Sequence, residues 1–188
     1  MGMRGGPLRR AVPGAPVGRR AHPDAPRPAS SGSPRATAAY LHDLRPLLAS
    51  AADLRRSFVQ EIGGLMDESG RSSRLVIAQV AGRAGRDHAG YFRKLKAQVD
   101  ALIPPATCLA CHVAVQRWLE RHVDASQVMI EVGRSGNLTR MHETQRLLAE
   151  ARDFARQLNA EYSRLVEELR QRVKAASRRA RGRASRAR

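Results

Sequence analysis

Apolar residues recur every three or four positions along most of this chain, and this spacing constrains the fold more than any other feature. In residues 37–68 the repeat places one set on a single helical face: Leu44, Leu47, Ala51, Leu54, Phe58, Ile62 and Leu65. Similar stripes run through residues 73–103, from Pro105 onward, and through residues 138–175. Clusters of β-branched residues are few, and aromatic residues make up only 4% of the chain. We therefore predict an all-α domain of four helices.

The two middle stripes contain both cysteines of the chain and two of its six histidines. The stripe of residues 73–103 consists of Leu75, Val80, Ala84, Tyr91, Leu95, Val99 and Leu102, with His88 between Ala84 and Tyr91. The stripe that follows Pro105 consists of Cys108, Cys111, Val115, Trp118, His122, Ala125 and Met129. We expect both sets to face the core.

Two breaks between helices share a pattern that predicts an internal repeat. "ESGRSSRL" (68–75) and "EVGRSGNL" (131–138) both read E-x-G-R-S-x-x-L, at an offset of 63 residues (68 to 131). Gly70 and Gly133 are expected to end their helices, because glycine readily adopts positive φ. Short turns join antiparallel neighbours, so we predict two related αα-hairpins, 37–103 and 104–170, in an antiparallel up-down four-helix bundle. Chance overlap of amphipathic helices is the alternative explanation.

The net charge of +17 is concentrated at the two ends of the chain. Residues 1–36 hold seven Arg and one acid, which gives +6, and residues 171–188 hold seven Arg, one Lys and no acid, which gives +8. The remaining 37–170 hold 19 basic and 16 acidic residues, which gives only +3. We expect both ends to be disordered basic tails, the first rich in Pro and the second without an apolar face.

Both cysteines of the chain lie in the motif Cys108-Leu109-Ala110-Cys111-His112. In this C-x-x-C-H spacing, two thiols can form thioethers to haem and the histidine can coordinate the iron. The motif resembles that of c-type cytochromes, and a helical bundle carrying it resembles the four-helix class of that family. That resemblance implies a covalent haem c held by Cys108, Cys111 and His112. The motif opens the third helix here, whereas that class attaches its haem on the last helix.

The same three residues allow other interpretations. Cys108, Cys111 and His112 share one helical face, so they could hold zinc together with a fourth ligand such as His42. Thiols at a helix start have their pKa lowered by the helix dipole, which favours redox chemistry. Free cysteine is also often a buried apolar residue, and this interpretation, with no cofactor, is the one we favour.

His88 and His122 form a second, weaker metal candidate. If the bundle is antiparallel, both residues face the core near one level, where bundles build metal sites. The Glu-x-x-His pair typical of di-iron bundles is missing from the sequence. The alternative is that each histidine is satisfied by a hydroxyl or backbone partner.

The arginines near the C-terminus are candidates for binding nucleic acid or an acidic protein: Arg178, Arg179, Arg181 and Arg183. Such a cluster neutralises phosphates without sequence specificity, and no aromatic residue lies among them to stack on bases. A solvated tail that binds nothing specific is the alternative.

No catalytic motif such as a phosphate loop or a nucleophile elbow occurs in the sequence. We therefore expect a non-enzymatic binding or scaffold protein, with a haem, metal or thiol redox protein as the alternatives. Its long helices could also pair with a second copy of the chain. We see no signal peptide and no run of about 18 apolar residues, so we expect a cytoplasmic protein without a transmembrane helix, exported only if haem c is attached.

Overall fold

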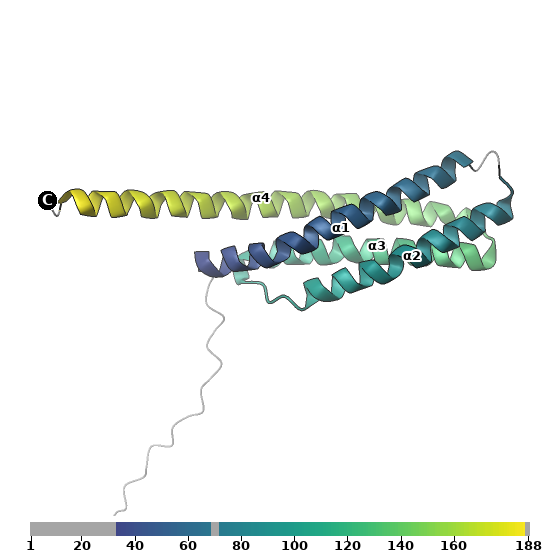
Figure 1. Ribbon diagram of the computed structural model, residues 1–188, viewed down its shortest axis with the longest axis horizontal. Coiled ribbons are helices and arrows are strands. Elements are labelled where there is room, and N and C mark those ends of the chain that lie inside the picture. Colours follow the sequence, from purple (N-terminus) through teal and green to yellow (C-terminus); the bar gives the residue numbers. More distant parts are fainter. Residues whose placement is uncertain (1–32, 69–71, 187–188) are drawn as a thin grey trace, which may run out of the picture.

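The structure, a computed structural model, describes residues 33–68 and 72–186 of the chain, and these ranges are helical apart from short connections (Figure 1). The four α-helices are α1 (Pro34–Glu68), α2 (Arg74–Asp100), α3 (Leu109–Ser135) and α4 (Met141–Arg186). Short 3₁₀ turns, Ala106–Cys108 and Leu138–Arg140, precede α3 and α4. The expectation of an all-α protein with four helices is confirmed.

Local signals set the helix ends. The Ser73 side chain caps α2 by accepting a hydrogen bond from the Val76 amide, and Asn137 accepts one from the Thr139 amide. α3 ends at Gly136, which adopts the left-handed conformation with φ of 69°. The expectation that Gly133 ends this helix is wrong, because Gly133 lies inside α3. Gly70 lies outside the described residues.

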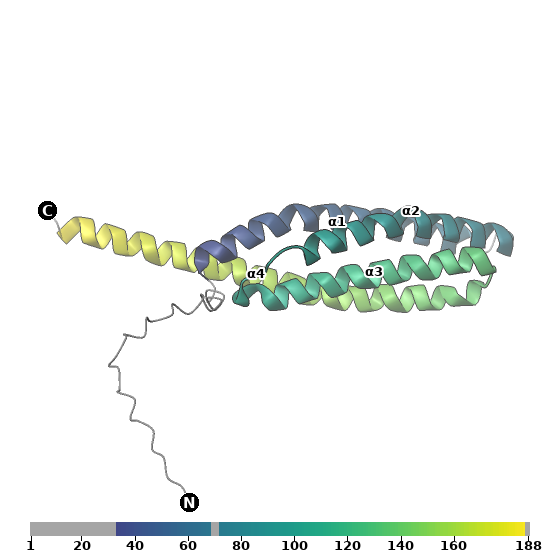
Figure 2. The same ribbon diagram turned by 90° about the horizontal axis from the view of Figure 1, so that it is seen from below.

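The helices lie lengthwise beside one another around a shared core (Figures 1 and 2). α3 packs extensively against both α2 and α4, α1 packs against α2, and α1 touches α4 in only a few places. The largest fully buried side chains include Phe58, Phe92, Leu44, Leu119 and Met129. The groove between α1 and α4 is therefore the least closed of the helix–helix interfaces.

Glycines let α2 and α3 approach each other closely. A Cβ added at Gly82 would lie 2.8 Å from the Cα of Gly133, and one added at Gly85 would lie 2.6 Å from the Ser126 carbonyl oxygen. These distances are too short for any side chain. The physical role of Gly133 is therefore to contact Gly82 across the interface rather than to end a helix.

The expected core stripe is right for α1 and α3 and partly wrong for α2. The α3 stripe from Cys108 to Met129 is buried as predicted. On α2, Leu75 and Tyr91 are 66% and 64% exposed, whereas Phe92, one position further on, is fully buried. Small residues at the α2–α3 interface decide which face of α2 is buried. The spacing of the large apolar residues alone predicted the wrong part of that face.

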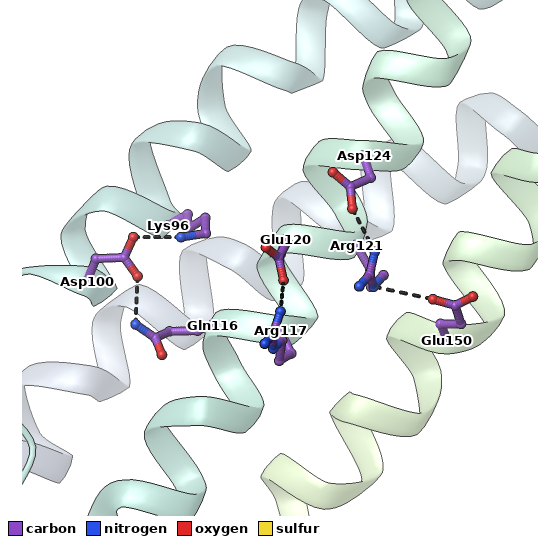
Figure 3. Close-up of polar contacts among 8 residues, drawn as sticks. All are labelled: Lys96, Asp100, Gln116, Arg117, Glu120, Arg121, Asp124 and Glu150. Carbon is purple, nitrogen blue, oxygen red and sulfur yellow. Dashed lines mark hydrogen bonds and ion pairs between the residues drawn. The ribbon is translucent and has the colours of Figure 1, made fainter.

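Polar side chains connect the helices at their surface (Figure 3). The Gln116 amide of α3 donates to Asp100 of α2 at 2.8 Å, and Lys96 donates to the same carboxylate at 2.7 Å. Burial alone would raise the pKa of Asp100, but these hydrogen bonds, together with the positive charge of Lys96, outweigh burial and lower it. Arg121 of α3 lies 3.3 Å from Glu150 of α4.

The C-terminal part of α4 differs from the expected disordered tail. α4 continues as a helix through Arg186 and projects past the end of the other three helices (Figure 1). Ala and Arg favour helix, and extending an existing helix avoids the nucleation step. We call residues 171–186 the basic extension. The expected N-terminal tail, 1–36, lies outside the described residues up to position 32, and α1 begins at Pro34.

Candidate functional site

The C-x-x-C-H motif lies at the start of α3, where the chain passes from the 3₁₀ turn into the helix. Cys108 precedes the first helical residue, and Cys111 and His112 occupy the first turn. Both cysteines are free and 0% exposed, and His112 is 7% exposed. All three side chains therefore face the core, as expected for residues spaced three and four apart on one helical face.

The surroundings of the motif suppress its acid–base chemistry. Burial, followed by the negative charge that the Cys108 thiolate would carry, raises the pKa of Cys111 to about 12. Burial also raises the pKa of Cys108, against weaker opposing hydrogen bonds from Thr107 and Thr37. The expectation that the helix dipole lowers the thiol pKa is wrong, because desolvation of a thiolate outweighs it here. Burial lowers the pKa of His112, whose Nδ1 lies 3.0 Å from the Tyr40 hydroxyl.

The motif does not fit a metal or a haem in this arrangement. Among the described residues, no group of three or more His, Cys, Asp and Glu side chains is placed to hold a metal ion. His42, the expected fourth ligand, instead lies exposed beside Asp43. A haem would need space beside both sulfurs, and the two sulfurs are packed in the core. In the described structure, Cys108 and Cys111 are packed among the apolar residues of the core.

His88 and His122 are both buried, and both rings lie close to that of Phe92. The Phe92 ring centroid is 4.9 Å from that of His122 and 6.4 Å from that of His88. In each histidine Nδ1 donates to the carbonyl four residues earlier, Ala84 for His88 and Trp118 for His122. The two residues therefore belong to an aromatic cluster, and the described structure offers no support for a metal bridged between them.

The second ring nitrogens of these histidines differ. Nε2 of His88 lies 3.3 Å from the Ser57 hydroxyl and 3.7 Å from a Glu61 carboxylate oxygen. Nε2 of His122 has no hydrogen-bond partner among the described residues, and the residue is 0% exposed. Burial lowers the pKa of His122 to about 4, with a smaller contribution from the positive charge of Arg55. His122 is therefore a neutral core residue at physiological pH.

The candidate polyanion-binding residues lie on the basic extension. Arg178 and Arg179 are exposed. Arg181 and Arg183 belong to the same helix, and their side chains lie outside what the structure describes. The four positions are thus carried on one continuous helix rather than on a disordered tail.

Sequence reasoning missed a hollow between α1 and α4, which we call the arginine pocket. It has a volume of about 710 Å³. Its polar and aromatic lining residues are Arg55, Arg56, Trp118, Arg152, Arg156 and Asn159. Arg55 and Arg56 follow Ala52 on α1, and Arg152 and Arg156 are one turn apart on α4, but nothing in either segment predicts that the two helices face each other.

No described helix is both long enough and apolar enough to cross a membrane. No protein-family model matches the chain, and neither the curated proteins nor the solved structures contain a match to it.

Proposed function

We propose that the chain is a non-enzymatic helical-bundle protein that binds nucleic acid through the basic extension of α4. The observation that carries this proposal is the separation of charge along α4. Inside the bundle, arginines lie beside acidic residues, and beyond residue 170 the helix projects from the bundle with no acidic residue at all.

Within the bundle, most arginines of α4 are paired with an acidic residue one turn away. On α4 such ion pairs join Arg140 to Glu143, Arg146 to Glu150, Arg156 to Asp153, Arg164 to Glu161, and Arg170 to Glu167. Eight basic residues follow in 171–188 without an acid. Along α4, uncompensated positive charge is therefore concentrated beyond residue 170.

The shape of the basic extension suits a nucleic-acid backbone. Its 16 residues span about 24 Å as an α-helix. At 100° per residue, Arg172 and Arg179 occupy one side of the helix, and Lys174 and Arg178 occupy the opposite side. An α-helix fits the major groove of a duplex, with phosphates along both edges, so positive charge on two sides can contact both strands. Binding of this kind is independent of base sequence and strongly dependent on salt.

In this proposal the bundle serves as the rigid base of the basic extension. We further propose an antiparallel up-down topology derived from two related hairpins. The short connections between helices and the direction of the chain in Figures 1 and 2 support the topology. The shared pattern at 68–75 and 131–138 supports the repeat. Superposition of the two halves in an experimental structure would test it.

The nucleic-acid proposal is tested by fluorescence anisotropy with a labelled DNA duplex at several salt concentrations. The variant replaces Arg172, Lys174, Arg178 and Arg179 with Gln. We expect it to bind the duplex at least ten times more weakly at low salt. We also expect the slope of log affinity against log salt concentration to decrease in magnitude by roughly 3 to 4. The reason is that each lost phosphate contact removes the release of close to one counterion.

A matched control removes the same charge from the bundle by replacing Arg117, Arg134, Arg140 and Arg146 with Gln. Each of these arginines is paired with a glutamate one turn away. We expect this control to change duplex affinity by less than about threefold. Equal losses in the two variants would mean that net charge alone drives binding, and the assignment to the basic extension would then be wrong.

A further inference from the structure

We propose that the arginine pocket binds a small organic anion that has an apolar body and a carboxylate or phosphate group. This site is separate from the basic extension and does not depend on the function proposed above. Its volume of about 710 Å³ falls within the range typical of small-molecule sites.

The electrostatics of the pocket favour an anion. Four arginines line it, and no acidic residue does. Arg56 is paired with Asp53 at 3.3 Å, and Arg156 is paired with Asp153 at 3.0 Å. Arg55 and Arg152 have no ion-pair partner among the described residues. Because α1 supplies one of these two guanidinium groups and α4 the other, an anion between the helices could be held from both sides.

A buried donor without a partner gives a second, independent indication of a ligand. Trp118 comes from α3, lines the pocket and is only 5% exposed. Its indole Nε1 is buried and has no hydrogen-bond partner among the described residues. A buried donor without a partner is costly, so native proteins usually provide one. Because Nε1 is shielded from solvent in the described structure, a ligand oxygen would reach it only after the Trp118 ring or a side chain beside it moves.

The rest of the lining suits the apolar body of the ligand. Leu48 of α1 and Leu158 of α4 contribute aliphatic surface, and the Trp118 ring adds an aromatic face. An inorganic anion would make no contact with the aliphatic and aromatic lining. A neutral apolar molecule would make no ion pair with the guanidinium groups. The lining therefore favours an aryl- or alkyl-carboxylate, or an ester of phosphate with such a group.

The test uses 4-phenylbutyrate as the probe. Trp118 is the only tryptophan of the chain, so its fluorescence reports directly on this pocket. We expect a saturable change in emission, confirmed by calorimetry on the full chain. The amide 4-phenylbutyramide, which has the same body without the charge, and inorganic phosphate, which has charge without the body, should each bind about tenfold more weakly or worse.

The variants assign the charge to specific residues. We expect Arg55→Gln with Arg152→Gln to weaken phenylbutyrate binding by about tenfold or more, and the corresponding lysine variant, which keeps the charge, to lose less. The matched control, Arg117→Gln with Arg134→Gln, should bind as the natural chain does. Thermal unfolding of each variant checks that the bundle is intact, and Trp118→Phe, followed by calorimetry, tests the indole donor.

Two outcomes would overturn the proposal. One is equal affinity for the carboxylate and the amide, which would reduce the site to an apolar hollow. The other is unchanged phenylbutyrate affinity in an intact Arg55→Gln, Arg152→Gln protein.

Discussion

At the scale of single residues, burial decides the acid–base chemistry of the C-x-x-C-H motif. Cys108, Cys111 and His112 share a helical face, as their spacing indicates, but that face points into the core. Desolvation then raises the pKa of the thiols and lowers that of the imidazole. The motif therefore has the residue types of a reactive site and the surroundings of an inert one.

The first prediction concerns the reactivity of the two thiols. We expect iodoacetamide to leave both cysteines unmodified in the native protein at pH 8 and to modify both in urea. The reason is that both sulfurs are fully buried and the pKa of Cys111 is raised to about 12. Mass spectrometry of the alkylated chain provides the measurement. Rapid labelling of the native protein would contradict the buried arrangement and would favour the thiol redox alternative.

The second prediction concerns His122 and acid stability. A histidine whose pKa falls from 6.5 to about 4 on folding binds its proton more tightly in the unfolded chain. The stabilisation that neutral His122 gives to the folded state is therefore fully present above about pH 6.5. It is lost as the pH falls toward 4, because the unfolded chain then binds a proton that the folded chain does not. Between pH 7.5 and 4.5 this loss amounts to about 2–3 kcal/mol.

The variant His122→Phe removes the titrating group while keeping an aromatic ring against Phe92 and Trp118. Urea unfolding at the two pH values should show that the variant loses about 2–3 kcal/mol less on acidification than the natural chain. Other titrating groups are common to both proteins and cancel in the comparison. An identical loss in the two proteins would show that His122 does not titrate in this range on unfolding.

At the scale of elements, the closest packing occurs between α2 and α3, where Gly82 meets Gly133 and Gly85 meets the backbone near Ser126. Glycine normally weakens a helix interior relative to alanine. Here the loss is offset by the close approach of two backbones, which brings the flanking apolar residues of both helices into contact.

The third prediction compares two glycines of α2. Gly82→Ala should destabilise the protein by about 1–3 kcal/mol, because the new methyl group would overlap the backbone of α3. Gly90→Ala should stabilise it by about 0.5–1 kcal/mol, because nothing lies within 4 Å of the added Cβ and alanine favours helix. Urea unfolding of both variants measures the difference. Similar effects at the two positions would mean that α2 and α3 do not touch at Gly82.

At the scale of the whole molecule, packing and charge are distributed unequally. The core is concentrated around α3, and the interface between α1 and α4 is loose enough to contain the arginine pocket. Excess positive charge accumulates at the end of α4, outside the bundle. The molecule thus combines a nearly neutral folded body with a charged projection.

The fourth prediction tests whether the basic extension is independent of the folded body. A chain that ends after Arg170 should unfold cooperatively, with a free energy of unfolding within about 1 kcal/mol of that of the full chain. The reason is that residues 171–179 are all exposed and bury little apolar surface. Circular dichroism during urea unfolding measures this, and a large loss of stability would show that the extension belongs to the folded body.

Much of the architecture could be predicted because helix formation depends on local spacing. The period of apolar residues placed the four helices and identified the buried faces of α1 and α3, but it ended the fourth helix near residue 175 rather than at Arg186. It misplaced Tyr91 because one period fits two neighbouring faces, and only contact with α3 selects between them. Gly133 was misplaced for a related reason, since a glycine can end a helix or admit a neighbouring backbone.

The sequence by itself determined that the chain is helical, that its charge lies at its ends, and that its only two thiols share one helical face with a histidine. These properties depend on residue identity and on spacings of a few positions. Only the tertiary structure decided that this face is buried, that both core histidines lie against Phe92, and that arginines of α1 and α4 line one hollow. Those properties depend on which helices become neighbours, and that choice arises from packing among residues far apart in the chain.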